Sequence, residues 1–189
     1  MTSSVFVPPS LALRPKDPDG QPLPWFVYVR EDGRPDWALV RNGAASEALR
    51  FDRCWYCGTH RGRRTSTFIA PPLPWPLDQH GHGEPLEPPA HLLCALWAVR
   101  TLPYIATPGR MRTDAYPGVS VLIHSGDWRA TGRGDFVRFH LSRYAAVRWF
   151  VGGQETPAEE ARRVAQEEAD RWTLGRPPAI NHEENTDHD

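Results

Sequence analysis

The chain has 189 residues, 22 basic and 23 acidic side chains and a formal net charge of −1, and a chain of this length can bury a hydrophobic core without disulfides. No stretch approaches the roughly 20 apolar residues of a membrane helix, and the N-terminal segment lacks the pattern of a secretory signal peptide. An odd number of cysteines with metal-binding spacing is typical of a reducing compartment, so we expect a cytoplasmic protein with no membrane contact.

Proline and polar residues dominate the N-terminal segment, and they predict an extended arm over residues 1–23. A zinc-binding α+β domain is expected over 24–154, followed by a C-terminal helix over 155–175 that packs on it. The acidic residues 176–189 are expected to form a disordered tail. Runs of β-branched and aromatic residues predict strands at 25–30, 37–41, 66–70, 119–123, 135–141 and 147–151.

The C-terminal helix carries the clearest local signals of the chain. Thr156-Pro157-Ala158-Glu159 has the pattern of a capping box with proline at the first helical position. An apolar stripe follows, and Gly175 is expected to end the helix.

Two pairs of metal-binding residues stand out, because in each pair the members are three positions apart. Cys54 and Cys57 form the first pair, and His91 and Cys94 form the second. They include every cysteine of the chain, and two such pairs separated by a loop match the needs of a tetrahedral zinc site. Gly58 suits the crowded, left-handed turn that ends a zinc knuckle. The sequence therefore predicts one structural Zn²⁺ bound by these four side chains.

The second pair is expected at the start of a helix. Pro88 and Pro89 precede an apolar run that begins at Leu92, and proline is tolerated in a first helical turn. His91 and Cys94 then face the same way in that turn, where the positive end of the helix favours a thiolate. A knuckle, an intervening hairpin and this helix predict a treble-clef-like zinc finger embedded in a small mixed domain with antiparallel strands.

Other interpretations of these residues remain open. The cysteines can be small buried hydrophobes with His91 as a capping residue. A Cys-x-x-Cys pair can also be a redox couple, although no βαβ pattern surrounds it here and Cys94 then has no role. His60, His80 and His82 are further candidates that can replace His91 or form a separate site, but solvated loop histidines are commoner.

The motifs CWYCG at 54–58, PPAHLLCA at 88–95 and LPYIATP at 102–108 resemble those of one family. It is a family of small uncharacterised zinc-finger-like proteins of high-GC bacteria and their phages and prophages, with the motifs CW-x-CG, PP-x-H-x-x-CA and C-P-F-L. The similarity covers about residues 50–172. The chain departs from the family at Thr101, where the family usually has a cysteine before the proline, so no role of that cysteine carries over. The resemblance implies zinc binding and a phage-related origin, and it implies no particular reaction.

An arginine-rich loop follows the knuckle and contains Arg61, Arg63 and Arg64. Guanidinium groups suit phosphate oxygens and acidic side chains, so the loop predicts contact with a nucleic acid or a host protein. Residues 1–154 hold 18 basic and 13 acidic side chains, whereas 155–189 hold 4 basic and 10 acidic ones. This excess of positive charge is modest for a nucleic-acid-binding domain, and a solvated basic loop is an equally good interpretation.

Enzymatic interpretations fit the sequence less well. The order of its motifs contradicts a zinc-dependent nucleobase deaminase. An HNH-like metal-dependent nuclease is the better alternative, since Asp78-Gln79-His80 resembles its Asp-His pair, but the proline-rich surroundings and a missing acid or asparagine on the helix oppose it. The sequence favours a non-enzymatic, zinc-stabilised binding protein without an organic cofactor, and a purely structural interaction protein is the remaining alternative.

Overall fold

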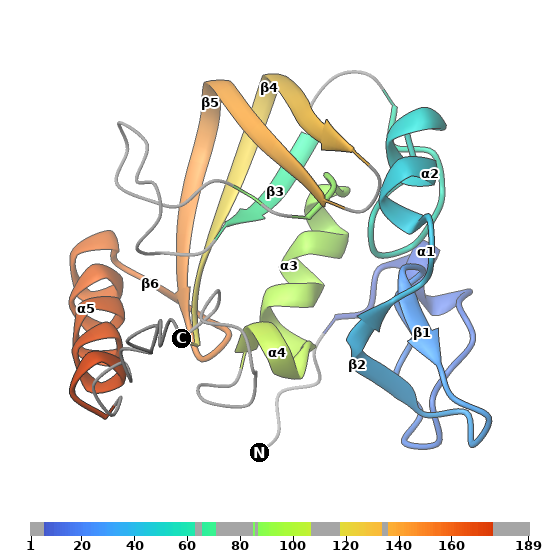
Figure 1. Ribbon diagram of the computed structural model, residues 1–189, viewed down its shortest axis with the longest axis horizontal. Coiled ribbons are helices and arrows are strands. Elements are labelled where there is room, and N and C mark those ends of the chain that lie inside the picture. The colour runs from blue at the N-terminus through green and yellow to red at the C-terminus, as the bar shows by residue number, and fades with distance from the viewer. Residues whose placement is uncertain are drawn as a thin grey trace, which may run out of the picture.

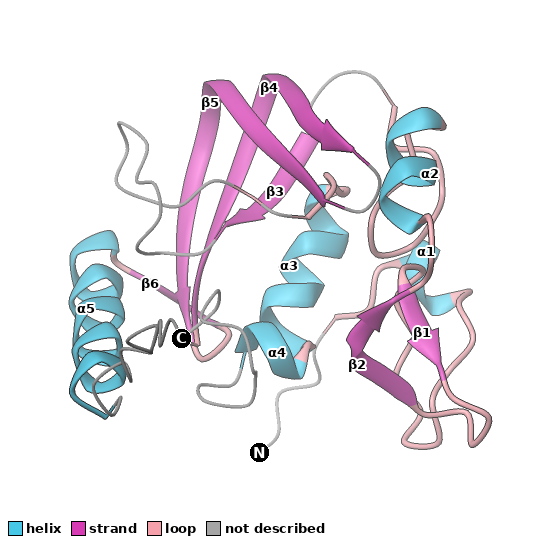
Figure 2. Cartoon of the chain, viewed as in Figure 1, coloured by secondary structure: helices cyan, strands magenta, loops and turns pink. Residues whose placement is uncertain are grey.

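The computed structural model describes residues 6–62, 66–70, 85, 87–106, 118–133 and 136–175. These residues form a mixed α+β fold with antiparallel strands and a C-terminal helix, which confirms the predicted fold class at that level (Figure 1, Figure 2). The elements in chain order are α1 (Pro9–Ala12), β1 (Val27–Val29), β2 (Pro35–Val40), α2 (Ala44–Arg50), β3 (Ser66–Ala70), α3 (Leu92–Thr101), α4 (Pro103–Ala106), β4 (Val119–Arg133), β5 (Phe136–Val151), β6 (Gln154–Thr156) and α5 (Ala158–Gly175).

The larger sheet has the strand order β3-β4-β5-β6, and all neighbouring strands are antiparallel. Leu122 and Phe150 belong to the same core cluster as the buried residues of α3, whereas Val121 and Trp149 pack in a second cluster with Ala161 of α5. Successive strand residues point to opposite faces, so the two helices cover the two faces of this sheet. Figure 1 shows α3 and α5 on opposite sides of the β4–β5 hairpin. Burial on both faces explains why apolar residues occupy successive strand positions in the sequence.

The predicted strands differ from the observed ones mainly in length. The prediction at 66–70 coincides with β3, whereas 119–123 is only the first part of β4. The segments 135–141 and 147–151 are two parts of one strand, β5. Polar residues interrupt the apolar pattern in the outer part of the β4–β5 hairpin, where β3 no longer pairs with β4, and there the sequence signal fails.

The N-terminal segment is packed against the core, so the prediction of an extended arm is wrong for its described residues. It contains α1 and an isolated bridge between Lys16 and Pro22. Leu11 and Leu23 are buried in the same cluster as Cys54. The sequence did not predict this packing against the core. The segment is rich in proline and polar residues, and its buried leucines are isolated and follow no helical or strand periodicity.

We expect Leu11→Ala to destabilise the protein by about 2–5 kcal/mol, because it leaves a cavity beside fully buried neighbours. Chemical denaturation followed by tryptophan fluorescence measures this change. Leu13→Ala is the matched control, since the Leu13 side chain is 88% exposed and its truncation should change stability by less than about 0.5 kcal/mol. Equal effects of the two substitutions would show that the N-terminal segment is not part of the core.

The C-terminal helix is confirmed, but it begins at Ala158 and not at 155. Thr156 belongs to β6, and its hydroxyl donates a hydrogen bond to the carbonyl of Gln154, so the expected capping box is replaced by a strand contact. The helix ends at Gly175 as predicted. The expected acidic tail over 176–189 lies outside the described residues. Within the described ranges, none of the helices has both the length and the apolar character of a membrane crossing.

Candidate metal centre

The structure brings the four predicted zinc ligands together. One ligand atom from each of Cys54, Cys57, His91 and Cys94 lies within 4.8 Å of the others. The Nδ1 atom of His91 is 3.5 Å from Sγ of Cys57 and 3.9 Å from Sγ of Cys94. Tetrahedral zinc with Zn–S bonds of about 2.3 Å and Zn–N bonds of about 2.0 Å separates a sulfur from a nitrogen by about 3.6 Å. The cluster therefore has the donor set and the size of a single metal site, which agrees with the predicted cofactor.

The first pair lies on a tight turn that is closed by backbone hydrogen bonds. The amide of Gly58 donates to the carbonyl of Cys54 at 2.9 Å, and the amide of Cys54 donates to the carbonyl of Thr59 at 2.8 Å. Gly58 has a φ of +76°, as predicted for a glycine at this place. The Thr59 hydroxyl lies 3.1 Å from Sγ of Cys57, where it can donate to a thiolate. Such hydrogen bonds favour the charged form of sulfur that a metal requires.

The second pair lies at the start of α3, with one correction to the predicted geometry. His91 is the N-cap residue, with an extended backbone (φ −67°, ψ 147°), and the helix begins only at Leu92. Pro88 and Pro89 therefore precede the helix and are not in its first turn. Cys94 is in the first turn of α3, where the partial positive charge of the helix terminus favours a thiolate.

The imidazole of His91 is held by its second nitrogen. Nε2 is 3.1 Å from the main-chain carbonyl of His60, which can only accept, so Nε2 carries the proton in this hydrogen bond. Nδ1 is then left without a proton in the neutral ring and faces the three sulfurs. A histidine fixed in this way is the usual arrangement in zinc sites. His60 thus supports the site through its backbone, and its ring is not among the clustered ligand atoms.

The electrostatics of the cluster follow from three sulfurs and one imidazole packed together. Hydrogen bonds from Cys54 and Cys94 hold the pKa of the Cys57 thiol well below its usual range. Hydrogen bonds to Cys54 and then Cys57, together with burial, raise the pKa of the Cys94 thiol, which keeps its proton. Hydrogen bonds to Cys54 and then Cys57 raise the pKa of His91 to about 10. Without a metal, these shifts favour a thiolate at Cys57 and a protonated imidazole at His91.

Zinc binding should release protons, because zinc takes neutral imidazole and ionised sulfur. Below the unfolded histidine pKa of about 6.5 the His91 imidazolium stabilises the metal-free fold fully, and this contribution is lost as pH rises through about 10. We therefore expect zinc affinity to rise with pH over this window. Calorimetric titration with zinc in two buffers of different protonation enthalpy measures the release. Binding heats that do not depend on the buffer would contradict this prediction.

The arginine loop is only partly described. Arg61 is present, but its side chain is 3% exposed and forms an ion pair with Asp52 and a hydrogen bond with Ser66. Arg61 is thus held within the fold instead of extending from the surface as the sequence analysis assumed. Arg63 and Arg64 lie outside the described residues. Binding of a partner by these three arginines stays a prediction.

The remaining histidine candidates and the nuclease motif receive no structural description, because His80, His82 and the Asp78-Gln79-His80 run lie outside the described ranges. The treble-clef topology is also unconfirmed. Thr67 of β3 pairs with Ala90 through two backbone hydrogen bonds of 2.8 and 3.1 Å, just before α3 begins. This single bridge resembles one end of the expected hairpin, but the main partner of β3 is β4, which follows the helix.

Comparisons with protein family models, curated proteins and solved structures found no match to this chain. The resemblance to the phage-associated family is therefore untested. What the structure itself supports is a cluster of three cysteines and one histidine in an α+β fold.

Sequence reasoning missed the side chains that surround the ligands. Ser10 of α1 places its hydroxyl 3.6 Å from Sγ of Cys94, across 84 positions of sequence. Trp25 lies directly over Gly58, and the amide of Trp25 donates to the carbonyl of Tyr56 at 2.7 Å. No local signal marks these contacts, because they depend on how the N-terminal segment folds back onto the knuckle.

Proposed function

We propose that this protein is a non-enzymatic binding protein whose treble-clef-like core is stabilised by one structural zinc ion. The observation that supports this most directly is the donor set of the cluster. Cys54, Cys57, His91 and Cys94 supply four good zinc ligands within 4.8 Å, and three of them are buried. Four protein ligands complete a tetrahedron and leave no position for a catalytic water. In this proposal the metal fixes the knuckle to the first turn of α3 and takes no part in a reaction.

A redox role for the cysteines fits the geometry less well. Cys54 and Cys57 are free thiols, but Cys94 and His91 converge on the same point. A thioredoxin-like couple uses two sulfurs and has no need of a third sulfur and an imidazole in contact with them. An HNH-like nuclease remains the alternative enzymatic function, and it rests on Asp78 and His80 in the sequence alone.

A nucleic acid or a host protein is the proposed partner, and the phage-related origin rests on the sequence resemblance. The excess of basic residues over 1–154 favours an anionic partner. The acidic residues after 155 instead favour contact with a protein. The basic and the acidic residues lie in different parts of the chain, so overall charge does not choose between the two partners. The surface near the metal centre offers more specific observations.

X-ray absorption at the zinc edge of the purified protein tests the structural role of the metal. We expect a first coordination sphere of three sulfurs and one nitrogen, with Zn–S distances of about 2.3 Å. A bound oxygen in place of one of these ligands would indicate an open site and would overturn the non-enzymatic proposal. Replacing His60 by alanine should leave the spectrum unchanged, because only its carbonyl contacts a ligand.

A further inference from the structure

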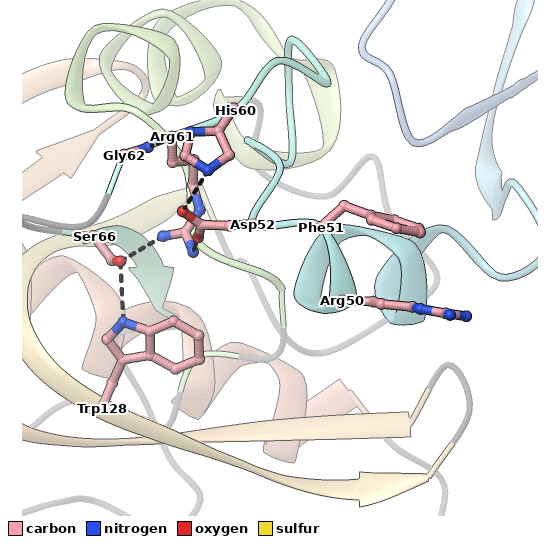
Figure 3. Close-up of a pocket in the computed structure, with 8 residues that line it drawn as sticks. All are labelled: Arg50, Phe51, Asp52, His60, Arg61, Gly62, Ser66 and Trp128. Carbon is pink, nitrogen blue, oxygen red and sulfur yellow. Dashed lines mark hydrogen bonds and ion pairs between the residues drawn. The ribbon is translucent and has the colours of Figure 1, made fainter.

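A polar pocket of about 450 Å³ lies next to the metal centre, between the C-terminal end of α2, residues 60–62, the start of β3 and Trp128 of β4 (Figure 3). This volume is within the range of about 300–1,000 Å³ that is usual for ligand sites. The pocket is directly connected to the zinc ligands, since His60 lines it and the His60 carbonyl accepts the hydrogen bond from His91.

The inner wall of the pocket carries an incompletely paired cation. The terminal nitrogens of Arg61 contact Asp52 and Ser66, and the indole of Trp128 donates to the Ser66 hydroxyl at 3.0 Å. The Nε–H of Arg61 is buried and has no hydrogen-bond partner among the residues that the structure describes. A buried guanidinium donor without a partner is unfavourable, so Arg61 keeps this wall of the pocket positively charged and polar.

The outer rim combines a second cation with an exposed aromatic ring. Arg50 is exposed, and within the described part of the chain it forms no ion pair. Phe51 is 51% exposed, and its ring centroid is 5.3 Å from Cζ of Arg50 and 5.9 Å from Cζ of Arg53. Figure 3 shows Arg50 and Phe51 extending in the same direction from the end of α2, away from Asp52 and Trp128, so they form the outer rim of the pocket. The rim therefore offers a positive charge beside a ring face that is still accessible.

The charges of the pocket favour an anion. The lining contains Arg50 and Arg61 against the single carboxylate of Asp52, so its net charge is positive even with His60 neutral. His60 is oriented by the amide of Gly62, which donates to Nδ1 at 3.1 Å.

We propose that the outer rim of this pocket binds single-stranded nucleic acid, with a backbone phosphate at Arg50 and the adjoining base stacked on Phe51. This inference rests on the proposed function as a binding protein. It specifies single-stranded nucleic acid as the partner and the rim of the pocket beside the metal centre as the binding site. A ring that lies against guanidinium groups and keeps an open side is typical of surfaces that bind unpaired bases without sequence preference. The carboxylates of an acidic peptide can pair with Arg50, but they present no aromatic face to stack on Phe51.

The test is fluorescence anisotropy of a short labelled oligonucleotide, as single-stranded DNA or RNA, titrated with the zinc-loaded full-length protein. We expect Phe51→Ala to weaken binding about tenfold, because stacking of one base on an aromatic ring is lost. Arg50→Ala should weaken binding and lower the slope of log affinity against log salt by about 1, because one phosphate contact is lost. Both residues are exposed, and zinc content and circular dichroism check that each variant is folded.

Matched controls separate these effects from general changes of charge and apolar area. Arg34→Ala removes an exposed arginine on the β1–β2 turn, and Phe6→Ala removes a phenylalanine that is 61% exposed. Neither lies in the pocket, and both should bind like the unmodified protein. An abasic strand with the same number of phosphates tests the stacking step, and we expect it to bind more weakly and to be insensitive to Phe51→Ala.

The possible failures are distinguishable. Binding by the unmodified protein that neither pocket substitution changes would overturn the pocket and leave a nucleic-acid partner elsewhere on the surface. Equal affinity for the abasic strand would overturn the stacking role of Phe51. No binding to either strand at low salt would overturn a nucleic-acid partner altogether and leave a protein partner for the domain.

Discussion

Removing zinc from the purified protein with a strong chelator is expected to unfold the region around the knuckle and α3. Structural zinc contributes on the order of 10 kcal/mol to small metal domains, which is comparable with the whole stability of a typical protein. The three sulfurs are buried in the same core cluster as Leu11 and α3, so the loss should spread through that cluster. Near-UV circular dichroism, recorded as zinc is withdrawn and returned, measures this change.

Substitution of a single zinc ligand should cause the same loss of zinc and of folded structure without a chelator. Cys54→Ser should remove zinc and unfold the protein, because a serine hydroxyl is a poor zinc ligand at neutral pH. His91→Ala and His60→Ala form a matched pair, since both remove an imidazole but only His91 contributes a ligand atom. We expect His60→Ala to keep its zinc. If Cys54→Ser keeps both its metal content and its fold, the metal centre has been assigned to the wrong residues.

Gly58→Ala is expected to destabilise the protein by about 3 kcal/mol or more. Two costs add at this position. An alanine at a φ of +76° is strained by about 1–2 kcal/mol, and overpacking a filled site costs about 1–3 kcal/mol. The added Cβ would stand 2.5 Å from Cγ and 3.0 Å from Nε1 of the Trp25 indole. Because Gly58 ends the turn that carries Cys57, the substitution should also weaken zinc binding. Chemical denaturation and competition with a zinc indicator measure the two effects.

Gly33→Ala isolates the backbone part of this cost. Gly33 has a φ of +77°, and a Cβ built there meets nothing within 4 Å, so only the strain of about 1–2 kcal/mol is expected. Adding Trp25→Ala to Gly58→Ala should recover part of the lost zinc affinity, since it removes the clash. Equal destabilisation by the Gly33 and Gly58 substitutions would show that the indole moves aside at no cost.

The metal ligands were predictable from sequence because their chemistry is local. Each pair is defined by a spacing of three residues, and no other cysteine of the chain competes for the metal. Gly58 was identified for the same reason, since its conformation is set by the turn itself. The prediction that His91 lies in the first helical turn was less accurate, since His91 is the N-cap residue. Local propensity does not define the first residue of a helix to within one or two positions.

The parts that sequence analysis missed depend on contacts between distant segments. The helix α2 is short and is stabilised by burial of Ala44, Ala45 and Ala48, and alanines give no clear apolar periodicity. Arg61 looked like a surface cation, because nothing in the local sequence shows that Asp52 and Ser66 surround it. The pocket is formed by four separate segments, so no single motif could have indicated it.

The hydrogen bond between His91 and His60 makes the metal a potential optical reporter of the pocket. A ligand that displaces His60 alters the bond to Nε2 of His91, and such a bond tunes the electron density that a histidine gives its metal. Zinc has a filled d shell and shows no colour, whereas cobalt(II) in the same tetrahedron absorbs visible light. The absorption spectrum of the cobalt-substituted protein should therefore change when an oligonucleotide occupies the pocket. This measurement needs no label on the oligonucleotide.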